Sequence, residues 1–517
     1  MDKALVFGVM LLLLVNTSAS MFDALTTETW TGETWTGETI YIRADGNIDP
    51  SDAPIVHDDT FTLYVLTKDL VISSGDGIVI ELDNIIIDGA GHTIQGSGGR
   101  GFVLSKRYNV TVKNTKIVSF FTGVFISCSS KCTISGNSIL EGYEGIYLSD
   151  SCDNIISENS IASVTIGISL GPYCDRNIIC RNTITECGHG VDLMSAYGNI
   201  ISGNNILHNY RGIFLETGMN IVIGNNIVSN DVGIKLYHSQ GVIITRNMIA
   251  KNGDGIILID STGNKICHNN FINNTKQAVS DALSIKNTWD NGYWPQPIYA
   301  YMGTEMNVEI STWDSGCPSG GNYWSDYIGT DNYSGLYQNI TGSDGIGDIP
   351  YIINEKNIDN FPLMKPRTEP DFSFVVSHPT IQLHLTESPN LPVSIEKTIT
   401  VISLFDFSQS IQLNVSGLPS GVTVSFDPKV VTPPPNGVSM FTVSFSIVDK
   451  GVKPGKYNIT VVGTSGDVTH TVSLFLTIII IRSTNIPLSI IGIITICGII
   501  FVAGIHTLYS RLRGRRK

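Results

Sequence analysis

Short apolar segments alternate with polar residues along most of the chain, and the pattern repeats. A glycine followed by an apolar, a variable and another apolar residue recurs every 21 to 23 residues, at Gly101, Gly123, Gly145, Gly167, Gly190, Gly212, Gly233 and Gly255. Alternation and β-branched residues predict two or three short strands per repeat. One repeat cannot bury its apolar face alone, so the copies must stack. The sequence therefore predicts a right-handed parallel β-helix.

Asparagines recur in the same register. One column comprises Asn114, Asn137, Asn159, Asn182, Asn204, Asn225, Asn247 and Asn269. A second, imperfect column comprises Asn109, Asn154, Asn177, Asn199, Asn220 and Asn264, with Cys132 and Val242 in the other two copies. An inward amide at a turn donates and accepts along the stack, so we expect asparagine ladders inside the β-helix.

The two ends predict export and anchoring. Residues 1–20 have the charge, apolar run and small residues of a signal peptide. Residues 486–509 are almost uncharged and long enough for a transmembrane helix, and the basic segment 510–517 is expected to stay cytoplasmic. We therefore expect a single-pass protein of the cell membrane with its bulk outside. The net charge of −14 without a basic patch before the tail excludes nucleic acid as an expected partner.

The predicted fold class is all-β apart from the transmembrane helix. An N-terminal lead-in at 21–60 precedes the β-helix at 61–285 and its C-terminal cap at 286–366. Composition changes at the polar, proline-bearing stretch 365–370, which suits a linker. Residues 367–480 alternate strands and turns, and they resemble the immunoglobulin-like β-sandwiches of archaeal and bacterial surface proteins. We expect this unit to act as a spacer, with an independent binding module as the alternative.

Several segments resemble one known family. They are IVIELDNIIIDGAGHTIQG, which ends at Gly96, then WDNGYW (289–294), SGGNYWSDY (319–327) and GSDGIGDIPY (342–351). With the repeats they resemble the NosD-like branch of the carbohydrate-binding and sugar-hydrolase β-helix families, especially archaeal surface proteins. The chain departs from that pattern by the insertion 295–317, so we expect an extra hairpin in the cap.

The variable residue of each repeat strand is expected to face outward. These residues are Val103, Phe125, Tyr147, Ser169, Asp192, Phe214, Lys235 and Ile257. Phe125, Tyr147 and Phe214 form the predicted ligand-binding strip, since aromatic faces stack against sugar rings. The alternative is that these side chains pack under a loop or are simply exposed.

Four polar residues on the same strip are weak catalytic candidates: His189, Asp192, Arg211 and Lys235. They fall on three successive repeats, which places an acid or base near a cation. A glycosidase needs two placed carboxylates, and the sequence offers no convincing pair. A solvated face is the favoured interpretation.

Metal sites and a disulfide are further candidates. The NosD resemblance implies copper, but His189, His208, His238 and His268 occupy different places in their repeats. The acidic residues of the cap, Asp326, Asp331, Asp344 and Asp348, suit calcium, with a structural acidic turn as the alternative. Cys152 and Cys174 lie at nearly equivalent places on adjacent repeats, so either a disulfide or free thiols is expected.

Three hypotheses about function follow. The leading one is a membrane-anchored extracellular protein that binds polysaccharide or glycoprotein glycans, or serves in the envelope or in adhesion, without chemistry. The second is a polysaccharide lyase or glycoside hydrolase. The third is a copper-related role, which the resemblance implies and the residues do not support.

Overall fold

The computed structural model describes residues 34–481, except 59, 291–297, 303, 304, 311, 314–319, 378, 387–390 and 450. Every regular element in this part of the chain is a β-strand. The predicted signal peptide 1–20, the apolar segment 486–509 and the basic tail 510–517 lie outside the described residues.

The expectation of a single-pass membrane protein is corrected. Within the described residues there is no helix with the length and apolar character needed to cross a membrane. The predicted location in the cell membrane, which rested on such a helix, is therefore not retained.

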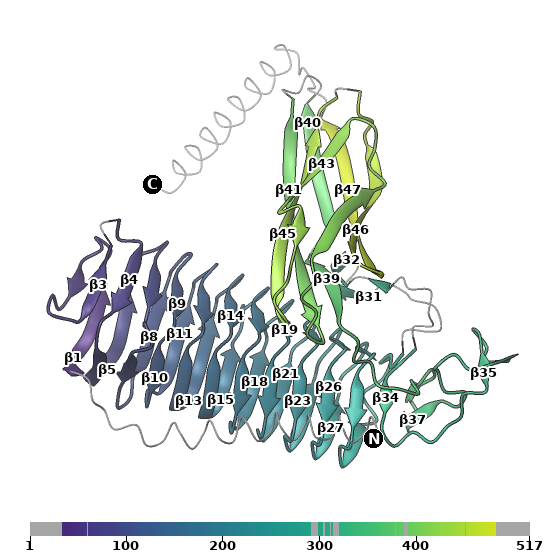
Figure 1. The fold of residues 1–517 in the computed structure, drawn as a ribbon, viewed down its shortest axis with the longest axis horizontal. Coiled ribbons are helices and arrows are strands. Elements are labelled where there is room, and N and C mark those ends of the chain that lie inside the picture. The colour runs from purple at the N-terminus through teal and green to yellow at the C-terminus, as the bar shows by residue number, and fades with distance from the viewer. Residues whose placement is uncertain are drawn as a thin grey trace, which may run out of the picture.

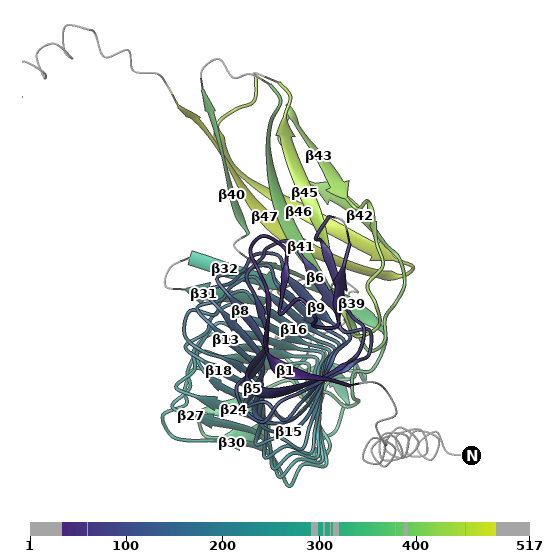
Figure 2. The same ribbon diagram turned by 90° about the vertical axis from the view of Figure 1, so that its left-hand side faces the viewer.

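The β-helix consists of successive coils, each of which contributes strands to three rows (Figures 1 and 2). Row 1 is an 11-stranded sheet. Its strands are β3 (Ile55–His57), β4 (Leu63–Leu66), β6 (Ile86–Asp88), β9 (Thr111–Lys113), β12 (Thr133–Ser135), β14 (Ile155–Ser157), β16 (Ile178–Cys180), β19 (Ile200–Ser202), β22 (Ile221–Ile223), β25 (Ile243–Thr245) and β28 (Lys265–Cys267).

Rows 2 and 3 join into one 20-stranded sheet because some strands run through both rows. Row 2 contains β7 (Thr93–Gln95), β10 (Lys116–Val118), β17 (Thr183–Thr185), β20 (Asn205–Leu207), β23 (Asn226–Val228), β26 (Met248–Ala250), β29 (Asn270–Ile272) and β34 (Tyr323–Trp324). Row 3 contains β8 (Arg100–Ser105), β11 (Thr122–Ser127), β18 (His189–Met194), β21 (Arg211–Glu216), β24 (Val232–Tyr237), β27 (Asp254–Ile259) and β30 (Lys276–Ser280). The strands common to both rows are β5 (Asp69–Ile80), β13 (Ser138–Ser149) and β15 (Ser160–Leu170), and β1 (Thr34–Ile42) with β2 (Ile48–Asp49) begins the stack.

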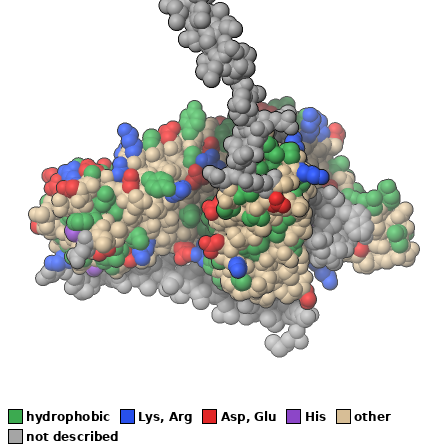
Figure 3. All heavy atoms as spheres, turned by 90° about the horizontal axis from the view of Figure 1, so that it is seen from above, with side chains coloured by type: hydrophobic (Ala, Val, Ile, Leu, Met, Phe, Trp, Pro, Cys, Tyr) green, Lys and Arg blue, Asp and Glu red, His purple; other side chains and the backbone are tan. Residues whose placement is uncertain are grey.

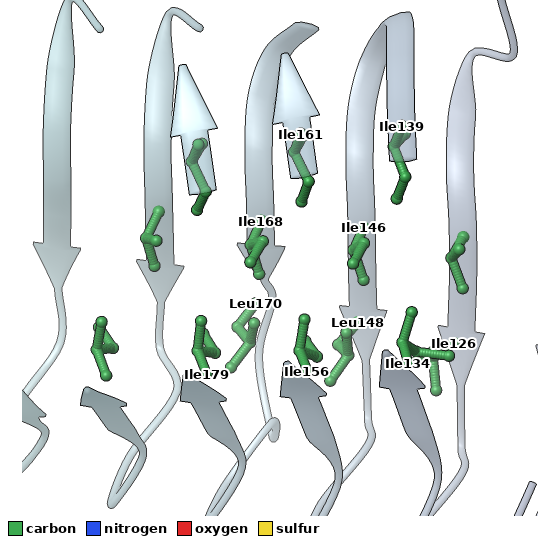
Figure 4. Packing of buried hydrophobic residues seen from close by; sticks show 14 of the residues in the cluster. Ile126, Ile134, Ile139, Ile146, Leu148, Ile156, Ile161, Ile168, Leu170 and Ile179 are labelled. Atoms are coloured by element: carbon green, nitrogen blue, oxygen red, sulfur yellow. The ribbon is translucent and has the colours of Figure 1, made fainter. Parts of the chain in front are cut away.

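Like side chains lie above one another in the core of the β-helix. Ile134, Ile156 and Ile179 are register partners in row 1, and all three are fully buried (Figure 4). Ile146 and Ile168 form the same relationship in row 3. Each buried isoleucine contributes about 1.5–3 kcal/mol relative to an exposed one, and stacking extends this core from coil to coil.

The asparagine ladders are confirmed from Asn137 onward. Asn159 shows the arrangement: its backbone N–H and its Nδ2 both donate to Oδ1 of Asn182, at 3.0 and 2.9 Å. Its Nδ2 also donates to the carbonyl of Ile134 in the preceding coil, at 2.9 Å. Each asparagine therefore provides hydrogen-bond partners for buried polar groups of its own coil and of both neighbouring coils. Without these partners, the buried groups would lower the stability of the fold.

Two expected ladder members lie outside the columns. Asn114 and Asn109 are exposed and have positive φ angles of 53° and 54°, one residue before the buried position. Thr115 takes the ladder position, and its N–H donates to Oδ1 of Asn137 at 3.1 Å. Further polar columns, which the repeat search missed, comprise Ser129, Ser151, Thr217, Ser239, Ser261 and Ser284, and separately Asn209, Asn230, Asn252 and Asn274.

The cap continues the stack before it departs from it. β34 pairs in parallel with β29, and Trp324 stacks on Phe271 with ring centroids 4.4 Å apart. Tyr351 stacks on the other face of Trp324, at 4.2 Å. The remaining cap strands are β35 (Tyr333–Ser334), β36 (Ile340–Thr341), β37 (Tyr351–Asn354) and β38 (Asn357–Asp359).

The C-terminal unit consists of two facing six-stranded sheets with a core of their own. The first sheet contains β39 (Asp371–Ser377), β41 (Val393–Leu404), β43 (Val422–Asp427) and β45 (Val438–Ile447). The second contains β40 (Thr380–Thr386), β42 (Ile411–Ser416), β44 (Val430–Val431), β46 (Gly455–Ser465) and β47 (Val468–Ile481). Its likeness to immunoglobulin-like sandwiches stays a prediction.

The expected hairpin in the insertion is present, but it belongs to the C-terminal unit. β31 (Ile298–Met302) and β32 (Glu305–Ile310) pair antiparallel, and β32 adds to the edge of β39. The next short strand, β33 (Thr312–Trp313), pairs with β47 in the other sheet. The insertion thus connects the cap to both sheets.

The C-terminal unit rests on the outer side of row 1 (Figure 2). An apolar cluster joins Ile221 and Ile223 of β22 to Ile402 and Leu404 of β41. Contact is close enough that a Cβ on Gly224, whose φ is +66°, would lie 2.6 Å from Cδ2 of Leu404. Row 1 is thereby covered on both sides over several coils.

Candidate functional site

The predicted outward strip runs along row 3. Register pairs Phe125 with Tyr147, and then Asp192 with Phe214. The rings of Phe125 and Tyr147 are 5.8 Å apart at 42°, and the guanidinium of Arg100 lies 3.9 Å from the centroid of Phe125. Phe125, Tyr147 and Phe214 are half-buried, so each ring keeps part of its surface open to a ligand. Their use by a ligand stays a prediction.

A second aromatic pair lies close to this column: Phe121 directly precedes β11, and Tyr143 lies within β13. Phe121 and Tyr143, four residues before Phe125 and Tyr147, stack at 5.0 Å and 14°. Both rings are exposed, with 55% and 44% of their surface accessible. The repeat register could have predicted this pair, because both residues occupy the same position in adjacent copies.

Three of the four catalytic candidates form one hydrogen-bonded chain. Nδ1 of His189 lies 2.6 Å from Oδ2 of Asp192, and NH1 of Arg211 lies 3.0 Å from Nε2 of His189. A guanidinium can only donate, so Nε2 accepts and the ring proton resides on Nδ1. His189 is therefore neutral, and Asp192 and Arg211 hold its ring in one orientation.

Asp192 is 4% exposed, and its Oδ1 has no hydrogen-bond partner among the described residues. A buried carboxylate oxygen without a donor is destabilising, so such groups merit a functional explanation. The arrangement brings an acceptor, a neutral imidazole and a cation together on two adjacent coils.

Lys235 lies beside this chain. It is the register partner of Phe214, and its Nζ lies 5.9 Å from the ring centroid. Burial, together with the neighbouring Arg211, lowers the pKa of Lys235 below its ordinary value. The structure thus brings all four catalytic candidates to one place.

Glu144 is a polar residue of this face that the sequence reasoning missed. Thr122 Oγ1 donates to its Oε2 at 3.4 Å. Burial raises the pKa of Glu144, and the charge of Asp192 acts in the same direction. Glu144 is the residue before its repeat glycine, as His189 and Arg211 are, and this shared position is the signal that could have found it.

The cap carboxylates accept hydrogen bonds from the cap itself. Asp331 accepts from the N–H groups of Asp344 and Gly345 at 3.0 and 2.9 Å. Asp348 accepts from the N–H of Asn332 at 2.8 Å, and Asp326 lies 3.2 Å from the hydroxyl of Tyr351. No group of three or more metal-binding side chains occurs in the described part of the chain. The calcium site stays a prediction, and the hydrogen bonds fit structural acidic turns.

Cys152 and Cys174 are free thiols in the structure, so the expected disulfide is corrected in favour of its alternative. The coil that separates them is one residue longer than the usual 22. The asparagine ladder shows this, since Asn154 pairs with Asn177, which lies 23 positions ahead. Cys174 therefore enters the buried column of Ser151, whereas Sγ of Cys152 lies 3.3 Å from the carbonyl of Tyr173. The two side chains occupy different columns.

The geometry described above agrees with the family comparisons. Residues 172–329 match the family described as periplasmic copper-binding protein (NosD), and residues 76–228 match the right-handed β-helix region. From residue 172 onward the coils thus resemble the repeats of the NosD family. No curated protein matches the chain. An archaeal origin stays a prediction.

Several solved structures are similar to parts of this chain. The A-module of a mannuronan C-5 epimerase from Azotobacter vinelandii is 13% identical over 50% of this chain and 89% of that one, with a TM-score of 0.35. An alginate lyase from Paenibacillus is 14% identical over 43% and 90%, with a TM-score of 0.30. Tailspike protein 2 of bacteriophage CBA120 is 10% identical over 79% and 72%, with a TM-score of 0.34.

Copper does not fit the residues of these NosD-like coils. His189 pairs with Asp192, and His238 lies 2.8 Å from Asp260, so the histidines stand apart with partners of their own. His268 is buried elsewhere, in the turn between β28 and β29. A copper site needs several imidazole or sulfur ligands that converge, and the described residues provide no such group.

Proposed function

We propose that this protein binds a glycan chain along the outer face of row 3. The observation that carries the proposal is the ordered set of aromatic rings on this face, with Phe125 and Tyr147 in contact and Phe214 further along. At the strand spacing of a β-sheet, Phe125 and Phe214 are roughly 19 Å apart, which gives room for several sugar rings along the stack. Aromatic faces are suitable platforms for the apolar sides of sugars.

We further propose an extracellular or periplasmic location and a role in the envelope or in adhesion. The family description, which names a periplasmic protein, supports the location. We propose that the C-terminal unit is immunoglobulin-like and acts as a rigid spacer. It contacts row 1 and leaves row 3 open to a ligand. The domain boundaries expected from the sequence (61–285, 286–366 and 367–480) are part of this proposal.

A glycan array with residues 34–481 tests the proposal. Phe125→Ala and Tyr147→Ala should each weaken binding by about tenfold, which corresponds to about 1.4 kcal/mol. Tyr337→Ala is the matched control, because this exposed tyrosine lies in the cap. Absence of binding across the array, or equal binding by all three variants, would contradict the proposal.

A polysaccharide lyase is the second candidate, and the neutral His189 favours it. Its Nε2 accepts from Arg211 in this structure, so it would act as the general base once Arg211 turns to the sugar carboxylate, and Asp192 would stabilise the imidazolium that forms when a proton is taken up. In β-elimination the base removes the proton next to the sugar carboxylate, the glycosidic C–O bond breaks, and a carbon–carbon double bond remains. Incubation with acidic polysaccharides should then release unsaturated ends, and His189→Ala should abolish them. Release of no unsaturated product from a broad panel would exclude this reaction.

A further inference from the structure

Two cations flank one aromatic ring on row 3. Arg211 belongs to the same strand as Phe214, and Lys235 is the register partner of Phe214 on the next coil. The guanidinium carbon and the ammonium nitrogen lie 5.3 and 5.9 Å from the ring centroid. Phe214 therefore has two positive groups close to its ring.

Neither Arg211 nor Lys235 forms an ion pair with a carboxylate of the described residues. The ion pairs in this part of the chain are formed by other basic side chains. Arg211 donates a hydrogen bond to the neutral His189. Burial and the charge of Arg211 both disfavour the charged form of Lys235 and lower its pKa. Two like charges held together without a counter-charge repel each other. An anion bound between them would remove this cost.

The acidic residues of this face either have other partners or lie far from Arg211 and Lys235. Asp192 accepts from His189, and Asp254 lies 3.9 Å from Lys276. Glu144 is three coils from Arg211 in the same column, roughly 14 Å at the strand spacing. On the coil that follows each cation, the next position in its column is apolar: Val232 follows Arg211, and Ile257 follows Lys235.

We infer that Arg211 and Lys235 form a subsite for the negatively charged group of an acidic sugar, whose ring lies against Phe214. This inference rests on the proposed glycan function and names the class of glycan. A guanidinium and an ammonium can bind either a carboxylate or a sulfate group. The subsite therefore requires a sugar with a negatively charged group of either kind. His189 acts here as a positioning residue that holds the guanidinium.

Binding to matched pairs of oligosaccharides tests the subsite. The probes are hexamers of galacturonate, mannuronate and guluronate, each beside its methyl ester, and a sulfated galactan hexamer beside its desulfated form. The purified protein should bind at least one charged member at least tenfold more tightly than its neutral counterpart, and added salt should reduce that difference. The pair that shows the preference identifies the anion as carboxylate or sulfate.

Two variants and one control assign the preference to these residues. Lys235→Met keeps the length of the side chain and should weaken binding of the charged hexamer about 5- to 30-fold while the neutral hexamer is unaffected, since one charge-assisted contact is lost. Arg211→Gln should act in the same way. Lys251→Met, which removes an exposed lysine from a turn, should change neither. Circular dichroism establishes that all three variants are folded.

The outcomes separate the inference from the function on which it rests. Equal binding of the charged and neutral members in every pair, or equal losses for Lys251→Met and Lys235→Met, would overturn the subsite and leave glycan binding intact. Failure of every hexamer and of the glycan array would overturn both.

Discussion

Asn269 and Asn322 are neighbours in one buried ladder although 53 residues separate them in the chain. Both the backbone N–H and Nδ2 of Asn269 donate to Oδ1 of Asn322, at 3.0 Å each. Asn322 in turn donates to the carbonyls of Ile266 and Trp289, at 2.9 and 2.7 Å. The cap therefore closes the β-helix by extending its own hydrogen-bonding pattern across an insertion.

Replacement of Asn322 by alanine should destabilise the cap end of the β-helix. The substitution leaves buried donors of Asn269 and two carbonyls without a partner, at a cost of about 1–3 kcal/mol for each. We expect a lower thermal midpoint than that of the wild type. Asn205→Ala is the control, since this asparagine is exposed beside the buried Asn204. Equal midpoints for the two variants would contradict the role of the ladder.

Asp359 should make the stability of the cap depend on pH. Burial raises its pKa to about 7, against the hydrogen bonds from the N–H of Asn322 and the indole of Trp324, which lower it. The unfolded chain loses this proton near pH 4, whereas the folded protein keeps it up to about pH 7, so the stability from this group falls as the pH rises from 4 to 7. Asp359→Asn should flatten the decline of the thermal midpoint over that interval. An unchanged pH profile in the variant would contradict the prediction.

The repeat register predicts the columns of row 3 correctly, because one glycine at a fixed place in each copy aligns the strands of successive coils, although Val103 and Asp192 of the outer column are buried. Once the repeat glycines are aligned, Phe125, Tyr147 and Phe214 must share one outer column, and they do. The same alignment contained the column of Glu144, His189 and Arg211. The residue before each glycine lies outside the pattern of glycine, apolar, variable and apolar residues, so this pattern did not single out Glu144.

Other features depend on departures from the regular repeat. The additional residue between Cys152 and Cys174 moves the second thiol into another column, and spacing alone does not reveal which position absorbs it. The strands of row 1 differ in a way that indicates a cover on their outer face. Ile221-Val222-Ile223 is apolar throughout, whereas Thr111-Val112-Lys113, at the equivalent position of an earlier coil, alternates between polar and apolar residues. Continuous apolar strands are typical of sheets covered on both faces, and here the C-terminal unit is the cover.

The cysteines of the β-helix should differ sharply in reactivity. Burial raises the pKa of Cys174 to about 12, whereas Cys128 is exposed. Only a thiolate reacts readily with an alkylating reagent, so Cys128 should be modified in the native protein and Cys174 only after unfolding. Mass spectrometry of native and denatured samples measures both. A mass two protons lower, located to a Cys152–Cys174 peptide pair, would show a disulfide and contradict this prediction.

The apolar contact with row 1 should decide whether the C-terminal unit stays docked. Ile223 is fully buried against this unit, so Ile223→Asp would place a carboxylate between Leu404 and its neighbours, where an unpaired charge is strongly unfavourable. Ser135→Asp introduces the same carboxylate at the equivalent position of β12, which lies outside the apolar contact, and serves as the control. We expect Ile223→Asp to increase the radius of gyration in small-angle scattering and to expose the 365–370 linker to protease, with the β-helix retained. The wild-type radius and protection in this variant, as in the control, would show that the strands of the insertion, rather than the row 1 contact, hold the unit in place.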